Sequence, residues 1–145
     1  MKKLKTTEMN RLTPDEFRNA SKIPVVVVLD NIRSQNNIGS VFRTADAFRI
    51  ERIYLCGITA TPPHREIHKT ALGATESVSW TYFPETIRAI EQLRREGYII
   101  SGIEQTTTSQ QLNLFRPMKG EKYALIFGNE VDGVSEEVMQ HVDGC

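Results

Sequence analysis

The hydrophobic positions of this chain predict strands and helices that alternate from about residue 23 onward. Val25 to Leu29 form an unbroken apolar run, which is typical of a strand covered on both faces of a parallel sheet. The apolar residues that follow, Ile38, Val41, Phe42 and Ala45, have the i, i+3, i+4, i+7 spacing of one helix face. The pattern therefore predicts a strand followed by a helix that packs on it.

The same alternation continues to the end of the chain. A helix is predicted between Pro84 and Gly97, another begins after Gly133, and the apolar segment Leu112–Phe115 is expected to dock back on the core. Since no internal repeat is present, we expect one α/β domain with a mainly parallel sheet flanked by helices. The further strands are predicted at Arg52–Cys56, Ser77–Phe83, Tyr98–Ile103 and Tyr123–Phe127.

Residues 1–22 are predicted to form an N-terminal helical extension to a domain at residues 23–145. Thr13 followed by Pro14 and two acidic residues is a helix-start pattern. The segment is also the most basic of the chain, and it could contact a polyanion or form a solvated helix. Its cationic residues are Lys2, Lys3, Lys5, Arg11, Arg18 and Lys22.

Composition removes several classes of protein. Lysine plus arginine equals aspartate plus glutamate at 18 each, so a nucleic acid would have to bind a local basic patch. No apolar run reaches membrane-spanning length and the two cysteines have no CxxC spacing, so we expect a cytoplasmic protein with no membrane segment. His64 and His68 lie one helical turn apart, but Arg65 stands where a zincin has its glutamate, and we expect no metal site.

Three polar loops follow predicted strands, and each could carry ligand-binding groups. They are Asn31–Ser40, Ile103–Thr107 and Gly128–Gly133, and the carboxyl ends of parallel strands are where open α/β sheets bind ligands. The first helix adds an amide, a hydroxyl and a cation through Asn37, Ser40 and Arg43, although a solvated helix start has the same composition. Neither a GxGxxG nor a GxxxxGK[ST] sequence occurs, so a dinucleotide-binding or P-loop module is disfavoured.

Trp80 is the only tryptophan of the chain. A tryptophan in a predicted strand most often belongs to the core. Stacking of a nucleobase on its ring is the alternative.

Two segments closely resemble the motifs of a known family. NNIGSVFRTADAF is similar to the first motif of the SpoU, or TrmH, branch of the SPOUT RNA methyltransferases, and LIFGNEVDGVSEEV is similar to the second. The segment HKTALGATESV between them also resembles its counterpart in that family. The resemblance runs from about Val25 to Gly144, so the chain is identified as a member of this branch.

The resemblance implies an α/β fold with a C-terminal knot, a homodimer, and S-adenosylmethionine as methyl donor. It implies methylation of a ribose 2′-hydroxyl in tRNA or rRNA. By position, Arg43 matches the catalytic arginine and Asn37 the asparagine that supports it. The positions implied for cofactor binding are Gly102, Ile103, Glu104, Gly128, Glu130 and Gly133, and the arginines that could bind RNA are Arg33, Arg43 and Arg65.

An arginine at this position fits electrostatic catalysis better than proton abstraction. The ribose hydroxyl is a weak nucleophile, so a site must stabilise the oxyanion that develops while aligning it with the methyl group. Arginine side chains are effectively always protonated, so we expect Arg43 to stabilise charge and position a phosphate.

Family members carry a third motif after the second, and Cys145 stands where it would begin. We therefore expect this chain alone to have an incomplete knot, weak cofactor binding and no methyl transfer. The alternative function is a catalytically inactive RNA-binding fragment of such an enzyme.

Overall fold

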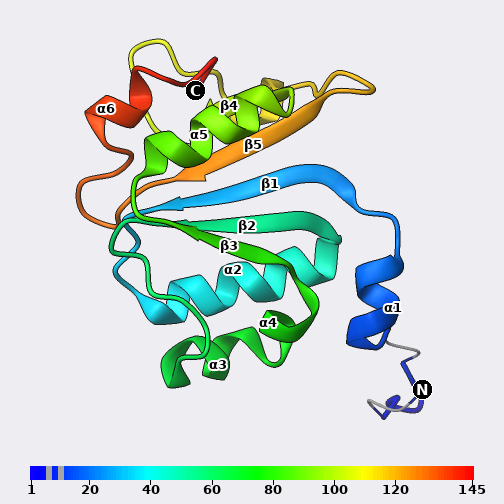
Figure 1. Ribbon diagram of the computed structural model, residues 1–145. Helices are drawn as coiled ribbons and strands as arrows, with labels where there is room; N and C mark the ends of the chain where they lie inside the picture. The colour runs from blue at the N-terminus through cyan, green and yellow to red at the C-terminus, as the bar shows by residue number, and fades with distance from the viewer. Residues whose placement is uncertain (6–7, 10–11) are drawn as a thin grey trace.

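The computed structural model describes residues 1–5, 8–9 and 12–145, and in it helices cover both faces of a parallel sheet (Figure 1). The sheet order is β3-β2-β1-β5-β4, and each neighbouring pair is parallel. The strands are β1 Ile23–Asp30, β2 Ile50–Cys56, β3 Trp80–Phe83, β4 Tyr98–Gly102 and β5 Lys122–Phe127. The helices are α1 Pro14–Asn19, α2 Gln35–Phe48, α3 Arg65–Ala71, α4 Ala74–Ser77, α5 Thr86–Arg95, η2 Leu112–Leu114 and α6 Glu136–Met139.

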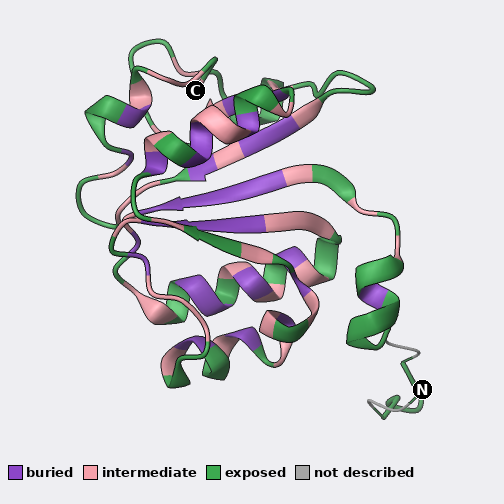
Figure 2. Ribbon diagram, viewed as in Figure 1, coloured by how far each residue is buried: buried purple, intermediate pink, exposed green. Residues whose placement is uncertain are grey.

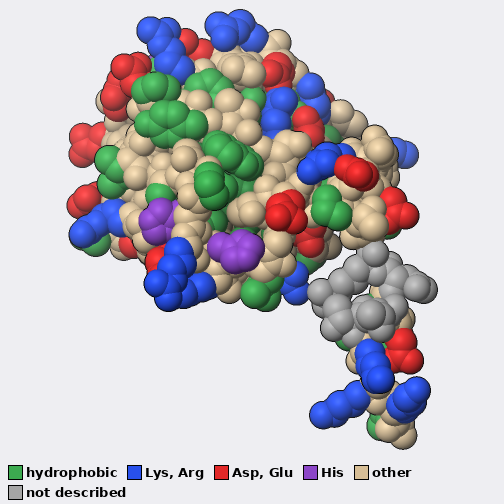
Figure 3. All heavy atoms as spheres, turned by 60° about the horizontal axis from the view of Figure 1, so that its bottom comes forward, with side chains coloured by type: hydrophobic (Ala, Val, Ile, Leu, Met, Phe, Trp, Pro, Cys, Tyr) green, Lys and Arg blue, Asp and Glu red, His purple; other side chains and the backbone are tan. Residues whose placement is uncertain are grey.

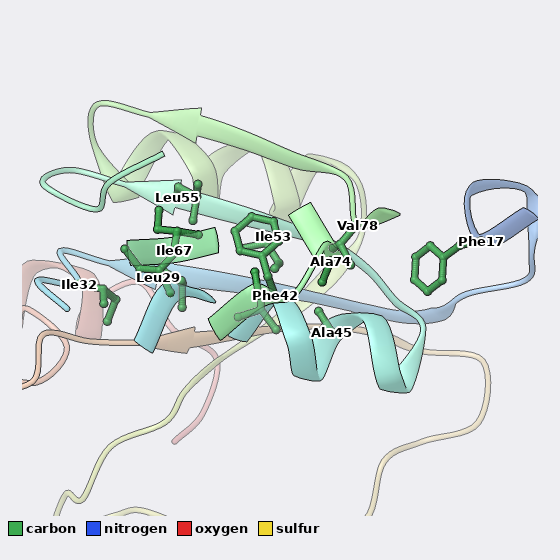
Figure 4. Close-up of a cluster of buried hydrophobic side chains, with 13 residues drawn as sticks. Phe17, Leu29, Ile32, Phe42, Ala45, Ile53, Leu55, Ile67, Ala74 and Val78 are labelled. Atoms are coloured by element: carbon green, nitrogen blue, oxygen red, sulfur yellow. The ribbon is translucent and has the colours of Figure 1, made fainter. Parts of the chain in front are cut away.

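The two faces of β1 bury alternate side chains in two separate apolar clusters. The second half of the strand is buried at every residue (Figure 2). Val27 and Leu29 pack in the cluster made with α2, α3 and α4, which Figure 4 shows around Phe42. Val26 and Val28 pack in the cluster on the other face, with α5 and α6. Burial on both faces explains why the strand has no polar alternation, and it confirms the predicted parallel sheet.

Helix α1 forms as its sequence predicts and packs on the domain. The Thr13 hydroxyl and the Glu16 carboxylate cap the first turn reciprocally. Phe17 is buried in the cluster below α2, and the Arg18 guanidinium donates to the carbonyl of Glu76 at 2.6 Å. Arg11, one of the predicted basic contacts, lies outside the described residues, and the domain boundary at residue 23 stays a prediction.

Two predicted segments differ in the structure. The strand predicted from Ser77 begins at Trp80, because the Val78 N–H still bonds to the Ala74 carbonyl and ends a helical turn there. The segment Leu112–Phe115 docks only at its end: Leu112 is 82% accessible, whereas Phe115 is partly buried and packs edge-on against Tyr123 of β5, with ring centroids 5.6 Å apart. The edge of β4 that it could have covered is paired with residues 143–144, through bonds that include Gly102 N–H to the Gly144 carbonyl at 2.9 Å.

No helix among the described residues has the length and apolar character needed to cross a membrane.

Gly39 allows α3 to lie directly against α2. A Cβ on Gly39 would come 2.0 Å from the Thr70 hydroxyl oxygen and 2.3 Å from the Ile67 carbonyl oxygen. The second of these is backbone and cannot rotate away. The close approach of the two helices therefore requires glycine at this position.

We expect Gly39→Ala to destabilise the chain although alanine is the better helix former. The added methyl group should lower the free energy of unfolding by about 1–3 kcal/mol, which outweighs a gain in helix propensity of about 1 kcal/mol. Urea unfolding followed by fluorescence measures the difference. Thr44→Ala, at an exposed position of the same helix, is the control and should change stability by less than about 0.5 kcal/mol; equal stability of both variants would contradict the account.

Candidate functional site

The three predicted polar loops meet at one edge of the sheet. Strands β1, β5 and β4 are neighbours, and the ends of β1 and β5 are in register because Leu29 pairs with Phe127. The direction in which successive strands are added to the sheet reverses between β1 and β5. Strands β2 and β3 lie on one side of β1, and β4 and β5 lie on the other. Such a switch point is where open α/β sheets hold their ligands. The loops meet at this edge as predicted, and its role as the ligand site stays a prediction.

The carboxylate of Asp30 closes the end of β1 and is only 1% exposed. It accepts hydrogen bonds from the Thr86 hydroxyl at 2.5 Å, the Asn31 amide at 2.9 Å and the Ser135 N–H at 3.2 Å. These donors come from the start of α5, the residue directly after β1 and the start of α6. A buried carboxylate needs such partners, so Asp30 sets where those segments begin.

Asn31 adds a second set of links from the same strand end. Its backbone is left-handed, with φ 57°, a conformation that asparagine tolerates better than most residues. The side-chain oxygen accepts from the Ile58 N–H at 3.1 Å, and the backbone carbonyl accepts from the Asn129 amide at 2.8 Å. Asp30 and Asn31 were not predicted as individual site residues; the signal that could have identified them is a pair of polar residues at the end of a buried apolar run.

Glu130 joins the loop after β5 to the loop after β1. Its carboxylate accepts from the N–H groups of Arg33 and Ser34 at 2.9 and 3.0 Å, and from the Asn37 amide at 2.9 Å. Partial burial favours the neutral acid, but the hydrogen bonds from Arg33, Ser34, its own N–H and Asn37 outweigh it and lower the pKa of Glu130 to about 2. These hydrogen bonds join the two motif-like segments, 36–48 and 125–138, into one structural unit.

The loop Gly128–Gly133 is closed on itself. Asn129 and Gly133 exchange two backbone hydrogen bonds of 2.9 Å, and Gly133 has φ +71°. A Cβ on Gly128 would lie 2.1 Å from the backbone nitrogen of Val134. Both glycines are therefore required by the shape of this turn.

A cavity of about 400 Å³ lies between this loop and the end of β4. The Glu104 carboxylate crosses from β4 and accepts from the N–H groups of Gln105 at 2.9 Å and Val134 at 3.0 Å. These two bonds lower the pKa of Glu104. The lining combines apolar and acidic side chains with backbone groups, and it consists of Ile103, Glu104, Phe127, Gly128, Asn129, Glu130, Val131, Asp132 and Gly133.

Arg43 is a half-buried cation with no hydrogen bond or ion pair to any of the described residues. Asn37, which was expected to support it, gives its amide to Glu130 instead. Six residues separate Asn37 from Arg43, so their side chains leave the helix about 120° apart. The guanidinium is therefore available to a ligand.

The other residues predicted to bind the cofactor or RNA lie in different parts of the structure. Gly102 is buried under α6, where a Cβ would come 3.0 Å from the Met139 sulfur, and it does not line the cavity. The Arg33 side chain is exposed near Glu130, while Arg65 lies at the start of α3 in a different groove.

Comparison with known proteins supports the sequence resemblance. A model of the SpoU rRNA Methylase family matches residues 24–145. An uncharacterized tRNA/rRNA methyltransferase of Synechocystis is 31% identical over 89% of this chain, which spans 33% of that protein.

Solved structures share the fold. An rRNA methyltransferase from Sinorhizobium meliloti, crystallised with AdoMet bound, superposes with a TM-score of 0.76 at 24% identity, over 88% of this chain and 49% of its own. A structure described as giving insights into 2-OH methylation of C/U34 on tRNA has a TM-score of 0.69 at 22% identity, over 83% of this chain and 78% of its own.

The chain thus spans a third of the Synechocystis relative and about half of the Sinorhizobium protein. The family match extends from the start of β1 through both motif loops to the last residue. The chain belongs to the SpoU rRNA methylase family.

Proposed function

We propose that this domain transfers a methyl group from S-adenosylmethionine to a ribose 2′-hydroxyl of tRNA or rRNA. The observation that carries the proposal is the joining of the two motif loops by Glu130 at the switch point, with the unpaired Arg43 on the helix that the first loop begins. The AdoMet bound to the Sinorhizobium protein and the tRNA 2-OH methylation named for the other structure support it. A homodimer and a knot, which the family resemblance implies, stay predictions.

The cavity at β4 and β5 has the chemistry to hold this cofactor. Ile103, Phe127 and Val131 offer apolar surface for a purine ring. The carboxylates of Glu104 and Asp132 favour ribose hydroxyls and positive charge, as on a sulfonium or an ammonium group. The glycines at the two ends of the Gly128–Gly133 turn have no side chain of their own, and the Glu104 carboxylate lies against Gly133, where a Cβ would come 2.2 Å from its oxygen.

The bound cofactor would supply a methyl group on a positively charged sulfur. Transfer would form a bond between the ribose oxygen and the methyl carbon and break the bond between that carbon and the sulfur. The hydroxyl proton would be released to solvent. Arg43 stabilises the negative charge that develops on the ribose oxygen, and it can hold the neighbouring phosphate. Because Arg43 has no partner among the described residues, no ion pair seen in this part of the chain has to be broken for this role.

Glu130 and Asn37 act as positioning residues. Their hydrogen bonds hold the start of α2 against the loop that borders the cavity. A helix held at its first turn presents Arg43, two turns later, at a constant place relative to the cofactor loops.

Because methyl transfer is expected only when the third motif is present, the proposal is tested by incubating a longer form of the chain that includes this motif with methyl-labelled S-adenosylmethionine and RNA transcripts. Label on a ribose 2′-oxygen protects the adjacent phosphodiester from alkaline hydrolysis, because the oxygen can no longer attack the phosphate. The proposal predicts label in alkali-resistant dinucleotides. Label in mononucleotides would indicate base methylation, and RNA binding without cofactor binding would favour the inactive RNA-binding alternative.

In the longer form that includes the third motif, we expect Arg43→Ala to lower the single-turnover rate of methyl transfer by about a hundredfold or more, as for loss of one preorganised group that stabilises an oxyanion. The dissociation constant for S-adenosylmethionine, measured by calorimetry, should change by less than about twofold, because Arg43 does not line the cavity. Arg95→Ala on α5, on the opposite side of the sheet, is the control. An unchanged rate in Arg43→Ala would remove this residue from the mechanism.

We expect Glu130→Gln to destabilise the chain at neutral pH and to lose this effect in acid. The folded pKa of about 2 lies below the unfolded value of about 4.3, so the carboxylate contributes stability that is complete above the unfolded value and is lost as the pH falls toward 2. Urea unfolding at pH values from 7 to 3 should show the gap between native chain and variant closing. Glu121→Gln, at an exposed glutamate before β5 with no side-chain bond among the described residues, should show no such trend, and a gap independent of pH would refute the assignment.

A further inference from the structure

A second cavity, of about 630 Å³, lies on the face of the molecule that carries α3. Its walls are the loop before α3, one side of α3 itself, part of α4 and the first residue of β3. Figure 3 shows histidine and basic side chains beside apolar atoms on this face. The lining residues with ring or charged groups are Pro62, Pro63, His64, Arg65, His68, Lys69, Glu76 and Trp80.

Trp80 forms both core and groove. It is partly buried and packs against the apolar cluster that contains Ile67 and Val78, yet it also lines the cavity. Its indole N–H makes no hydrogen bond to a described residue. The two roles considered for this residue are therefore compatible, since one part of the ring serves the core and another remains accessible.

The charges around the groove leave one cation without a partner. Lys69 is held by the Glu66 carboxylate at 2.7 Å, whereas Arg65 makes no ion pair or side-chain hydrogen bond among the described residues. The His64 Nδ1 accepts from the Glu66 N–H at 3.2 Å, so in the neutral ring the proton is on Nε2 and can be donated outward. Glu76 is the acidic group of the lining.

The groove is connected to the candidate active site through α3. The Thr70 hydroxyl on α3 donates to the Asn36 carbonyl on α2 at 2.9 Å, beside the close contact at Gly39. Helices in direct contact lie about 8–10 Å apart. The loop before α3 is also tied to the end of β1, because the Thr59 hydroxyl bonds to the Leu29 carbonyl and the Ile32 N–H, both at 3.0 Å.

We propose that this groove binds single-stranded RNA next to the nucleotide that reaches Arg43, with a base stacked on Trp80 and a phosphate held by Arg65. An aromatic platform beside an unpaired cation is the arrangement that binds single strands without sequence preference. It suits a nucleic acid better than a protein segment, because the free groups at the rim are a guanidinium and an imidazole N–H that can bind phosphate. The inference rests on the proposal that RNA is the substrate.

The only tryptophan of the chain makes occupancy directly measurable. A short oligouridylate, added without S-adenosylmethionine, should quench Trp80 emission with the same midpoint as binding followed by anisotropy of a labelled oligonucleotide. Inorganic polyphosphate, which has charge but no bases, should compete for the site without comparable quenching. Binding of the oligonucleotide with unchanged Trp80 emission would overturn the groove while leaving RNA binding elsewhere intact.

Two variants separate stacking from charge. Arg65→Gln should weaken binding and reduce the slope of log K against log salt by about 0.7, the value for one phosphate contact with a single strand. Arg95→Gln, an exposed arginine on α5, should leave the slope unchanged. Trp80→Leu, checked for folding by circular dichroism, should weaken binding by about fivefold or more.

Equal affinity and equal slope in Arg65→Gln and Arg95→Gln would reject the groove as an RNA site. Because these measurements need neither cofactor nor methyl transfer, that result would leave the proposed reaction standing. Quenching of Trp80 by a peptide but not by oligonucleotide would assign the groove to a protein partner and would also overturn the proposal.

Discussion

The carboxylate of Asp30 is the constraint on which the rest of the site depends. It is buried at the end of the central strand, and an unpaired charge there would cost several kcal/mol. Its three donors bring the starts of α5 and α6 to the end of β1. The demand for hydrogen bonds at one buried group therefore determines the geometry of loops that are far apart in sequence.

Glu130 also holds a distant loop through backbone N–H groups, but nearer the surface and at the start of the helix that carries Arg43. Asp30 holds the segment that follows the Gly128–Gly133 turn, while Glu130 ties the turn itself to the first turn of α2. Carboxylates thus satisfy the backbone N–H groups that would otherwise attract an anion at this edge. Positive charge for a phosphate or an oxyanion has to come from side chains, and Arg43 has no partner among the residues that the structure describes.

The sequence predicted the parallel sheet, its strands and the meeting of three loops, because these depend on local apolar patterns and on a general rule about strand ends. Long-range contacts were not predictable in the same way. The pairing of Asn37 with Glu130 and the links from Asp30 to Thr86 and Ser135 join residues 56 to 105 positions apart. The strand start at Ser77 was wrong for a local reason, because a helical turn closed by the Val78 N–H and the Ala74 carbonyl continues past it. The exposure of Leu112 was not predictable because the edge of β4 is paired with residues 143–144 instead.

The central claim is that the loops joined by these carboxylates form the cofactor site beside Arg43. The most direct measurement is an NMR titration of the isotope-labelled chain with S-adenosylmethionine, with every backbone amide observed. The account predicts that the largest shift changes occur at Ile103 and Glu104 and in Gly128–Gly133, with smaller changes at the start of α2. Two results would contradict it. One is that the largest shift changes occur on α3 or at residues 143–144, which pair with the outer edge of β4. The other is that no saturable change occurs in the two loops.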